Sequence, residues 1–156
     1  MDKAKPMVVR LTAGGAPLTP EQFAATTLTV DLEGLDFAYA PPFSTAIHPF
    51  AHVLNVLKNK MAGSLESMTP AEYAAGEAEG YRILDASLKP TIEGAPYIDL
   101  PSVTGPIDGV DKDEKVLLVC NKGKRAYLVQ NRLKAFGYTN TKVLEGGNLF
   151  TDVTVD

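Results

Sequence analysis

Cysteine is almost absent from this chain: Cys120 is the single one among 156 residues. One cysteine excludes an internal disulfide framework and any cysteine-rich zinc site. Long apolar runs are also absent, so the sequence offers no membrane span, and its first residues do not resemble a signal peptide. The formal net charge of −4 provides no basic excess that would attract nucleic acid or anionic lipid. We therefore expect a cytoplasmic protein with no nucleic-acid or membrane partner.

The composition is that of a folded protein, with 45% hydrophobic and 22% charged residues. Two regions differ in character. Residues 1–63 are rich in Ala, Thr and Pro, whereas residues 64–156 alternate short apolar runs with helical patterns. The length suits one ordinary domain with a lead-in. We predict an N-terminal extension over 1–63, partly irregular and partly helical, followed by a domain over 64–156.

The extension contains two helix signals. Thr19 is typical of an N-cap, and Pro20 after it suits the first helical position, which indicates a short helix. A longer amphipathic helix is predicted over about 47–61, because its apolar residues recur at helical spacing. They are Ile47, Phe50, Val53, Leu54, Leu57 and Met61. Such an apolar stripe needs a surface to pack against.

The second region predicts an α/β domain. Strands are expected at 81–86, 97–100, 115–120 and 141–145, and helices at about 70–79 and 124–136. The run at 116–119 is unbroken and apolar, as in a central parallel strand. Strands that alternate with helices favour a mostly parallel sheet flanked by helices.

Cys120 lies where the third of these strands meets a tight turn and the next helix. In parallel α/β folds the carboxyl ends of the strands are the usual place for ligands. The first N–H groups of a helix have no helical partner and can converge on a sulfur atom. Lys122, Lys124 and Arg125 add positive charge close to the thiol. Helix N-termini and cations favour the reactive thiolate, so the pattern predicts a nucleophilic cysteine rather than a packing residue.

The loop Cys120-Asn121-Lys122-Gly123-Lys124-Arg125 resembles the rhodanese active-site loop, C-x-x-G-x-R. Residues 81–86 are similar to an early strand of that family that ends in Asp, and 133–147 to its final helix, strand and double glycine. The resemblance implies a rhodanese-like α/β fold and a sulfurtransferase with Cys120 and Arg125 as catalytic residues. It also implies that five residues in and just after the loop bind the substrate: Asn121, Lys122, Gly123, Lys124 and Ala126. The donor would be a small sulfane-sulfur compound and the acceptor a thiol or cyanide.

The sequence departs from the family pattern at three places. Ala86-Ser87 stands where the family often has Arg, the segment 93–96 lacks the usual His, and Ala126 replaces a common Ser. A non-catalytic rhodanese-like interaction module is therefore an alternative. Cysteine phosphatases use a similar loop, but they place five residues between Cys and Arg, whereas four intervene here. The shorter loop suits a single sulfur atom better than a phosphoryl group.

Residues 26–60 are similar to the end of the dimerisation domain of CoA-disulfide reductases and related NADH oxidases. The resemblance implies a homodimer formed through the N-terminal segment, and it leaves open that the chain is the detached C-terminal part of such a flavoprotein. The sequence has no G-x-G-x-x-G fingerprint, so we expect no flavin, nicotinamide or other cofactor. His48 and His52 are four residues apart, but no acidic or cysteine ligand completes a site, and we expect no metal.

Overall fold

The computed structural model describes residues 12–13, 16–17 and 47–155. The chain divides into two compact units, Met1–Met61 and Ala62–Asp156. In the first unit, β1 (Thr12–Ala13) and β2 (Ala16–Pro17) pair as antiparallel strands. The helix predicted to begin at Thr19 lies outside the described residues.

Helix α3 (Pro49–Met61) confirms the helix predicted over 47–61. It begins where the Phe50 amide donates a hydrogen bond to Nδ1 of His48 (3.2 Å), so this histidine caps the helix. Leu54 is buried, whereas Val53 and Val56 on the same helix are exposed. No helix among the described residues is long and apolar enough to cross a membrane.

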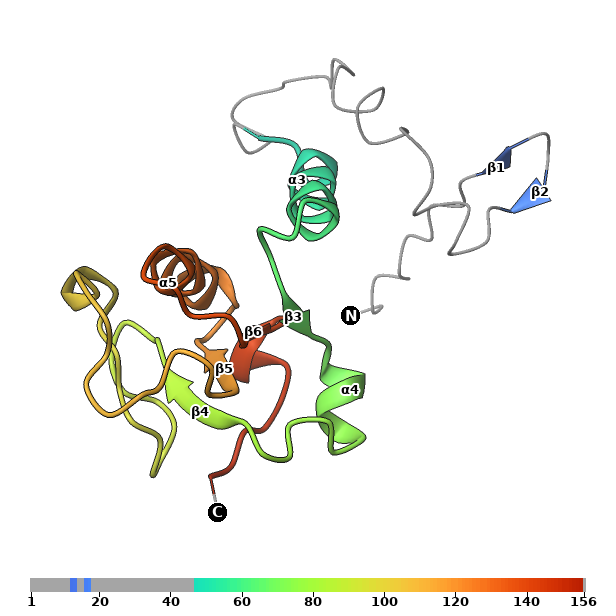
Figure 1. Ribbon diagram of the computed structural model, residues 1–156. Helices are drawn as coiled ribbons and strands as arrows, with labels where there is room; N and C mark the ends of the chain where they lie inside the picture. Colours follow the sequence, from blue (N-terminus) through green and yellow to red (C-terminus); the bar gives the residue numbers. More distant parts are fainter. Residues whose placement is uncertain (1–11, 14–15, 18–46, 156) are drawn as a thin grey trace. The chain divides into compact units, whose positions relative to one another are not determined.

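The second unit is built on a four-stranded parallel sheet in the order β3-β6-β5-β4 (Figure 1). The strands are β3 (Ser67–Met68), β4 (Arg82–Asp85), β5 (Val116–Val119) and β6 (Thr141–Leu144). All four residues of β5 are buried, as expected of a central strand covered on both faces. The predicted α/β fold with a mostly parallel sheet is confirmed.

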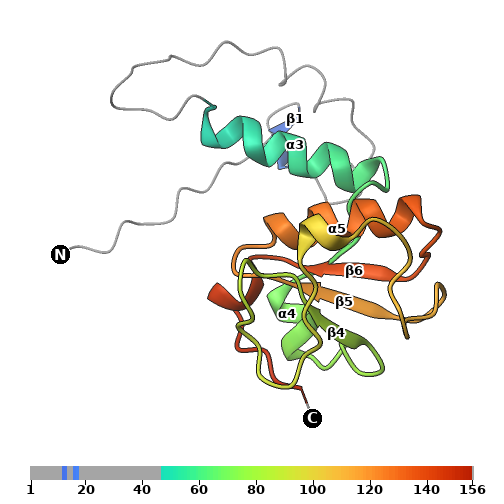
Figure 2. The same ribbon diagram turned by 90° about the vertical axis from the view of Figure 1, so that its left-hand side faces the viewer.

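Two apolar clusters cover the two faces of the sheet. Alternation along β5 sends Val116 and Leu118 into one cluster and Leu117 and Val119 into the other. The first cluster includes the buried face of α5 (Lys124–Ala135). The second lies on the side of α4 (Pro70–Ala74), and Figure 2 shows α5 and α4 on opposite faces of the sheet.

Three details differ from the sequence predictions. The helix expected to run to about residue 79 ends at Ala74, although Thr69 and Glu72 form the capping box at its start. Gly76 then takes a φ of +87°, a left-handed conformation that turns the chain away. The strand expected at 97–100 is a single bridge between Asp85 and Tyr97, followed by the 3-10 helix η1 (Leu100–Ser102). The short edge strand β3 was not predicted.

Candidate active site

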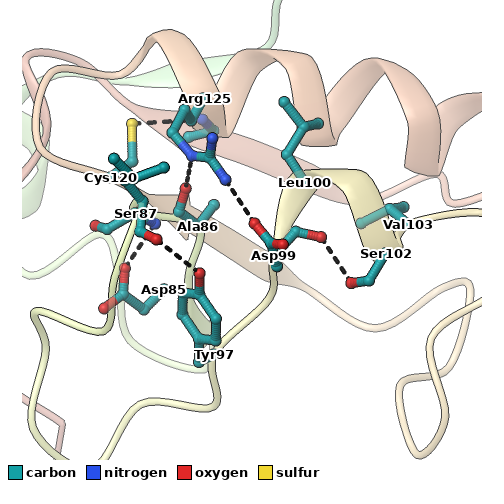
Figure 3. A network of polar contacts seen from close by, with 12 residues as sticks. Asp85, Ala86, Ser87, Tyr97, Asp99, Leu100, Ser102, Val103, Cys120 and Arg125 are labelled. Atoms are coloured by element: carbon teal, nitrogen blue, oxygen red, sulfur yellow. Dashed lines mark hydrogen bonds and ion pairs between the residues drawn. The ribbon is translucent and has the colours of Figure 1, made fainter.

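Cys120 follows β5 directly and lies beneath the start of α5. The residue is buried, with 3% of its surface exposed. Its Sγ accepts a hydrogen bond from the backbone amide of Ala126 (3.4 Å) in the first turn of α5 (Figure 3). That amide belongs to the group of N–H donors that a helix leaves without helical partners. The first turn of α5 therefore presents a hydrogen-bond donor to the sulfur.

Gly123 makes the turn between strand and helix possible. It is the N-cap of α5 and has a φ of +84°, which favours glycine over other residues. A side chain here would also contact the carbonyl oxygen of Leu144 at 3.5 Å and the amide nitrogen of Gly146 at 3.6 Å. These are ordinary contact distances, so the chain needs glycine at this position for its backbone angle and not for lack of space.

Arg125 ties the loop to two other segments. Its Nε donates to the carbonyl oxygen of Ala86 (3.1 Å), just beyond β4, and its Nη2 forms an ion pair with Oδ1 of Asp99 (2.8 Å). Figure 3 shows the guanidinium between these two partners. Its side chain thus acts as a brace between the loop, β4 and the segment before η1. Lys122 and Lys124, by contrast, are exposed at the surface.

The double glycine after β6 packs directly on the cysteine loop. The amide of Asn148 donates to the carbonyl oxygen of Cys120 (3.1 Å), and that of Leu149 donates to the carbonyl oxygen of Asn121 (3.1 Å). A Cβ on Gly147 would stand 1.7 Å from the Cys120 oxygen, so no side chain fits there. Gly147 opens the 3-10 helix η2 (Gly147–Leu149), which therefore fixes the backbone of the loop.

Asp85 is a buried carboxylate at the end of β4. It accepts hydrogen bonds from the amides of Ser87 (2.9 Å), Thr91 (2.5 Å) and Ile92 (3.0 Å). Burial raises the pKa of the Asp85 carboxyl, but the side-chain hydrogen bond from Ser87 and these amides outweigh it and lower the pKa overall. The Thr91 hydroxyl accepts from Nδ2 of Asn148 (2.8 Å). Asp85 is thus connected, through Thr91 and Asn148, to the segment that holds Cys120.

Sequence reasoning missed three residues of this network, namely Thr91, Asp99 and Asn148. Thr91 and Asp99 lie in loops and Asn148 lies in η2, and the bond between Asn148 and Thr91 spans 57 residues of sequence. Asp85 did carry a signal, since a charged residue that ends an apolar strand demands partners. The structure brings the sequence-predicted loop residues together around Cys120, from Asn121 to Ala126. It holds Arg125 against Asp99.

The sequence matches the family described as Rhodanese-like domain over residues 54–148. The chain belongs to the rhodanese-like domain family. A solved NAD-dependent persulfide reductase from A. fulgidus is 30% identical, with a TM-score of 0.64, over 78% of this chain and 22% of that one. The reduced CoADR-RHD of Bacillus anthracis is 25% identical, with a TM-score of 0.65, over 78% of this chain and 23% of that one.

This rhodanese-like chain therefore spans less than a quarter of the length of these two relatives. The likeness agrees with the resemblance to CoA-disulfide reductases noted from residues 26–60. Among curated proteins, none matches its sequence.

The departures from the rhodanese pattern lie inside the polar network. Ser87, in the segment where the family often has Arg, is buried, and its hydroxyl lies 2.9 Å from that of Thr91. The segment 93–96, which lacks the family's His, still supports β4, because the carbonyl oxygen of Pro96 accepts from the Asp85 amide (2.9 Å). Ala126 supplies its backbone amide to Cys120, a contact that does not depend on its side chain.

A cavity of about 560 Å³ lies elsewhere in the domain. Its lining includes Tyr73, Tyr81 and Pro96, together with the C-terminal residues Thr154 and Val155. No residue of the cysteine loop takes part in it. The chemistry of the thiol is therefore to be sought at the loop and not in this cavity.

Proposed function

We propose that this domain is a sulfurtransferase that carries sulfane sulfur as a persulfide on Cys120. The observation that carries the proposal is the amide of Ala126, 3.4 Å from Sγ at the first turn of α5. An amide at a helix N-terminus stabilises an anion on the sulfur, both as the thiolate and as the persulfide. Membership of the rhodanese-like family supports the same chemistry.

The reaction has two steps. The Cys120 thiolate attacks the outer sulfur of a donor such as thiosulfate, the S–S bond of the donor breaks, and sulfite leaves with the bonding electron pair. A thiol or cyanide then attacks the outer sulfur of the Cys120 persulfide, and the electron pair of its S–S bond returns to Sγ. Neither step needs an external oxidant or reductant. A thiol that must be free at the start of each cycle suits the reducing cytoplasm.

The loop residues have distinct roles in this proposal. The backbone of Asn121 to Ala126 forms a cradle for the persulfide, with Gly123 allowing its turn. Arg125 keeps the loop in place through Ala86 and Asp99. Lys122 and Lys124 are exposed and attract anionic donors to the loop.

Mass spectrometry tests the proposal most directly. Incubation of the protein with thiosulfate should add the mass of one sulfur atom, and peptide mapping should place it on Cys120. The Cys120→Ser variant has no sulfur at this position and should gain nothing, while its circular dichroism stays that of a folded protein. A wild-type chain that forms no persulfide with thiosulfate or with a low-molecular-weight persulfide would refute the proposal.

A second candidate is a non-catalytic interaction module, and the burial of Cys120 favours it. A cysteine with 3% exposure in an apolar cluster can serve as a packing residue. Iodoacetamide separates the two functions, because a packing thiol should react only as fast as the protein unfolds. A reactive Cys120 in the folded protein excludes this candidate.

A third candidate is the C-terminal part of a CoA-disulfide or persulfide reductase. The similarity to the reductases from A. fulgidus and Bacillus anthracis favours it. In that setting the domain would pass sulfur to, or receive it from, a flavoprotein active site. The genomic sequence upstream of Met1 would decide between a separate protein and a part of a longer one.

We also propose that the N-terminal unit mediates a homodimer. Val53 and Val56 of α3 have 60% and 48% of their surface exposed, one helical turn apart. Exposed apolar residues at this spacing mark a helix face suited to association. Light scattering of the full chain should give a dimer, and Val53→Ser with Val56→Ser should shift it towards monomer. A wild-type chain that is monomeric at high concentration would refute the dimer.

A further inference from the structure

Large apolar side chains are exposed around the cysteine loop. Leu88 follows β4 and is 72% exposed, while Leu149 and Phe150 follow β6 and are 61% and 72% exposed. Both segments leave the carboxyl edge of the sheet, and Figure 2 shows them at the same end of the domain. Apolar groups gathered in this way at the surface of a soluble domain mark an interaction site.

Hydrogen bonds hold these two segments against the active-site loop. The Leu149 amide donates to the Asn121 carbonyl oxygen (3.1 Å), and Asn148 Nδ2 donates to the Thr91 hydroxyl (2.8 Å). The carbonyl oxygen of Leu88 accepts from the Tyr97 hydroxyl (3.1 Å). The backbone segments that carry the exposed apolar side chains are therefore fixed relative to Cys120.

The charged side chains in three segments that border or form the loop are lysines. Within 87–92, 121–124 and 147–151 every charged side chain is a lysine, and all three lysines are exposed: Lys89, Lys122 and Lys124. Asp85 is buried, and Asp99 is paired with Arg125. The exposed acidic residues Glu93 and Asp152 lie just beyond these segments. These three exposed lysines lie on a chain whose formal net charge is −4.

We propose that this surface docks an acidic polypeptide whose cysteine thiol accepts sulfur from Cys120. A small anionic donor such as thiosulfate is served by the lysines alone and gains nothing from apolar side chains. A polypeptide that presents acidic and apolar residues around a cysteine matches both features of the surface. The proposal rests on the sulfurtransferase function and names the class of acceptor. We call Leu88, Leu149 and Phe150, with the three lysines, the acceptor surface.

The transfer is a thiol–persulfide exchange. The thiolate of the docked cysteine attacks the outer sulfur of the Cys120 persulfide and forms a new S–S bond. The S–S bond to Sγ breaks, and its electron pair stays on Cys120 as the thiolate. The acceptor leaves as a persulfide, so one sulfur atom moves and no electrons are gained or lost overall.

Competition between acceptors tests the proposal in the full chain. The protein is loaded with thiosulfate, and sulfur transfer is followed by mass spectrometry to cyanide and to two short peptides, each with one cysteine between leucines. One peptide carries glutamates and the other carries lysines in their place. We expect kcat/KM for the acidic peptide to exceed that for the basic peptide by about tenfold or more at low salt, and to fall as salt rises.

A double variant probes the apolar part of the surface. Leu88→Ser with Phe150→Ser should lower kcat/KM for the acidic peptide about tenfold, mainly through KM, and leave transfer to cyanide unchanged. Leu128→Ser is the matched control, because Leu128 is 40% exposed on α5, outside the acceptor surface, and its loss should change neither rate.

The outcomes separate the two levels of the proposal. A protein that forms no persulfide on Cys120 fails as a sulfurtransferase before any acceptor is added. Persulfide that passes to cyanide and to both peptides at equal rates would overturn the acceptor surface alone. Transfer to the peptides that is unaffected by the double serine variant would overturn it as well.

Discussion

The two ends of the parallel strands differ. At their carboxyl ends, here called the carboxyl edge of the sheet, polar groups are buried and have several fixed partners. At their amino ends, the amino edge, charged groups pair near solvent. Asp85 accepts hydrogen bonds from three backbone amides, and the Cys120 carbonyl oxygen accepts one from the amide of Asn148. At the other edge Arg82 and Glu114 pair at 3.6 Å with about a third of each side chain exposed. Buried, multiply bonded groups define one conformation, while exposed ion pairs contribute little to stability. Hydrogen bonds therefore fix the geometry of the carboxyl end of the sheet, where Cys120 lies.

Gly147→Ala should have the largest effect. Its Cβ would stand 1.7 Å from the Cys120 carbonyl oxygen, so the loop or η2 must move. We expect a loss of about 2–4 kcal/mol in the free energy of unfolding and of nearly all sulfur transfer. Urea denaturation and the thiosulfate–cyanide assay measure the two.

Gly109→Ala is the matched control for this substitution. Gly109 has a similar φ of +71°, but nothing lies within 4 Å of the position that its Cβ would take. The substitution should therefore cost only about 1 kcal/mol of backbone strain and leave sulfur transfer intact. Equal losses in the two variants would show that the backbone angle, and not contact with the cysteine loop, is what matters at Gly147.

Asp85→Asn should come next. The amide removes the charge and turns one acceptor into a donor that faces other donors, which should cost about 1.5–3 kcal/mol at pH 7. Because the pKa of Asp85 is lowered in the folded state, its contribution is complete above the unfolded carboxyl pKa of about 3.9. It is then lost as the pH falls through the folded pKa, which lies lower still.

The urea midpoint of unfolding, measured from neutral pH down to the pH at which the folded protein protonates Asp85, checks the sign of this pH dependence. The difference between wild type and Asp85→Asn should be constant from pH 7 to about pH 5 and shrink below about pH 4. Asp108→Asn, at an exposed position, should match the wild type throughout. A gap between wild type and Asp85→Asn that widens in acid would contradict the role given to the carboxylate.

Arg125→Lys should have a smaller effect on stability than on activity. Lysine keeps the charge, but it cannot bond Ala86 and Asp99 together in the way that the guanidinium does. We expect a loss of about 1 kcal/mol, since the ion pair is partly exposed, and sulfur transfer about tenfold slower because the loop is less well held. Asp99→Asn keeps the contact with Ala86 and should slow transfer less. Wild-type rates in Arg125→Lys would show that the brace is dispensable.

The elements that the sequence predicted well are those whose signal is local. The unbroken apolar run of β5 and the helical spacing before Gly137 indicated their structures directly, and Gly123 placed the turn between strand and helix. The end predicted for this helix was wrong because the chain turns at Gly76, six residues after α4 begins at Pro70. The strand expected at 97–100 was wrong because its pairing stops after one bridge to Asp85.

The residues of the candidate site also divide into those with a local sequence signal and those without one. Cys120, Gly123 and Arg125 lie in one short segment, so their spacing alone suggested a loop around a sulfur. The partners that hold the loop come from three other segments, and nothing near Thr91 or Asn148 in the sequence marks them as neighbours. Non-local hydrogen bonds of this kind depend on the sheet order, which brings β4 and β6 to either side of β5.

The amino edge should give the smallest effects, and the ring of Tyr81 offers the sharpest test there. Lys115 and Lys142 each place Nζ 5.7 Å from the centre of this ring. A cation over an aromatic ring contributes about 0.5–1 kcal/mol at exposed sites. Lys115→Met and Lys142→Met keep the apolar stems and remove the charges, so each should lower stability by no more than this amount. Double-mutant cycles with Tyr81→Leu isolate the coupling from the loss of the ring itself. Sulfur transfer should be unchanged in all these variants, since the ring lies at the edge opposite Cys120. A coupling above about 2 kcal/mol, or a slower transfer, would mean that the two edges of the sheet are not as different as their hydrogen bonds indicate.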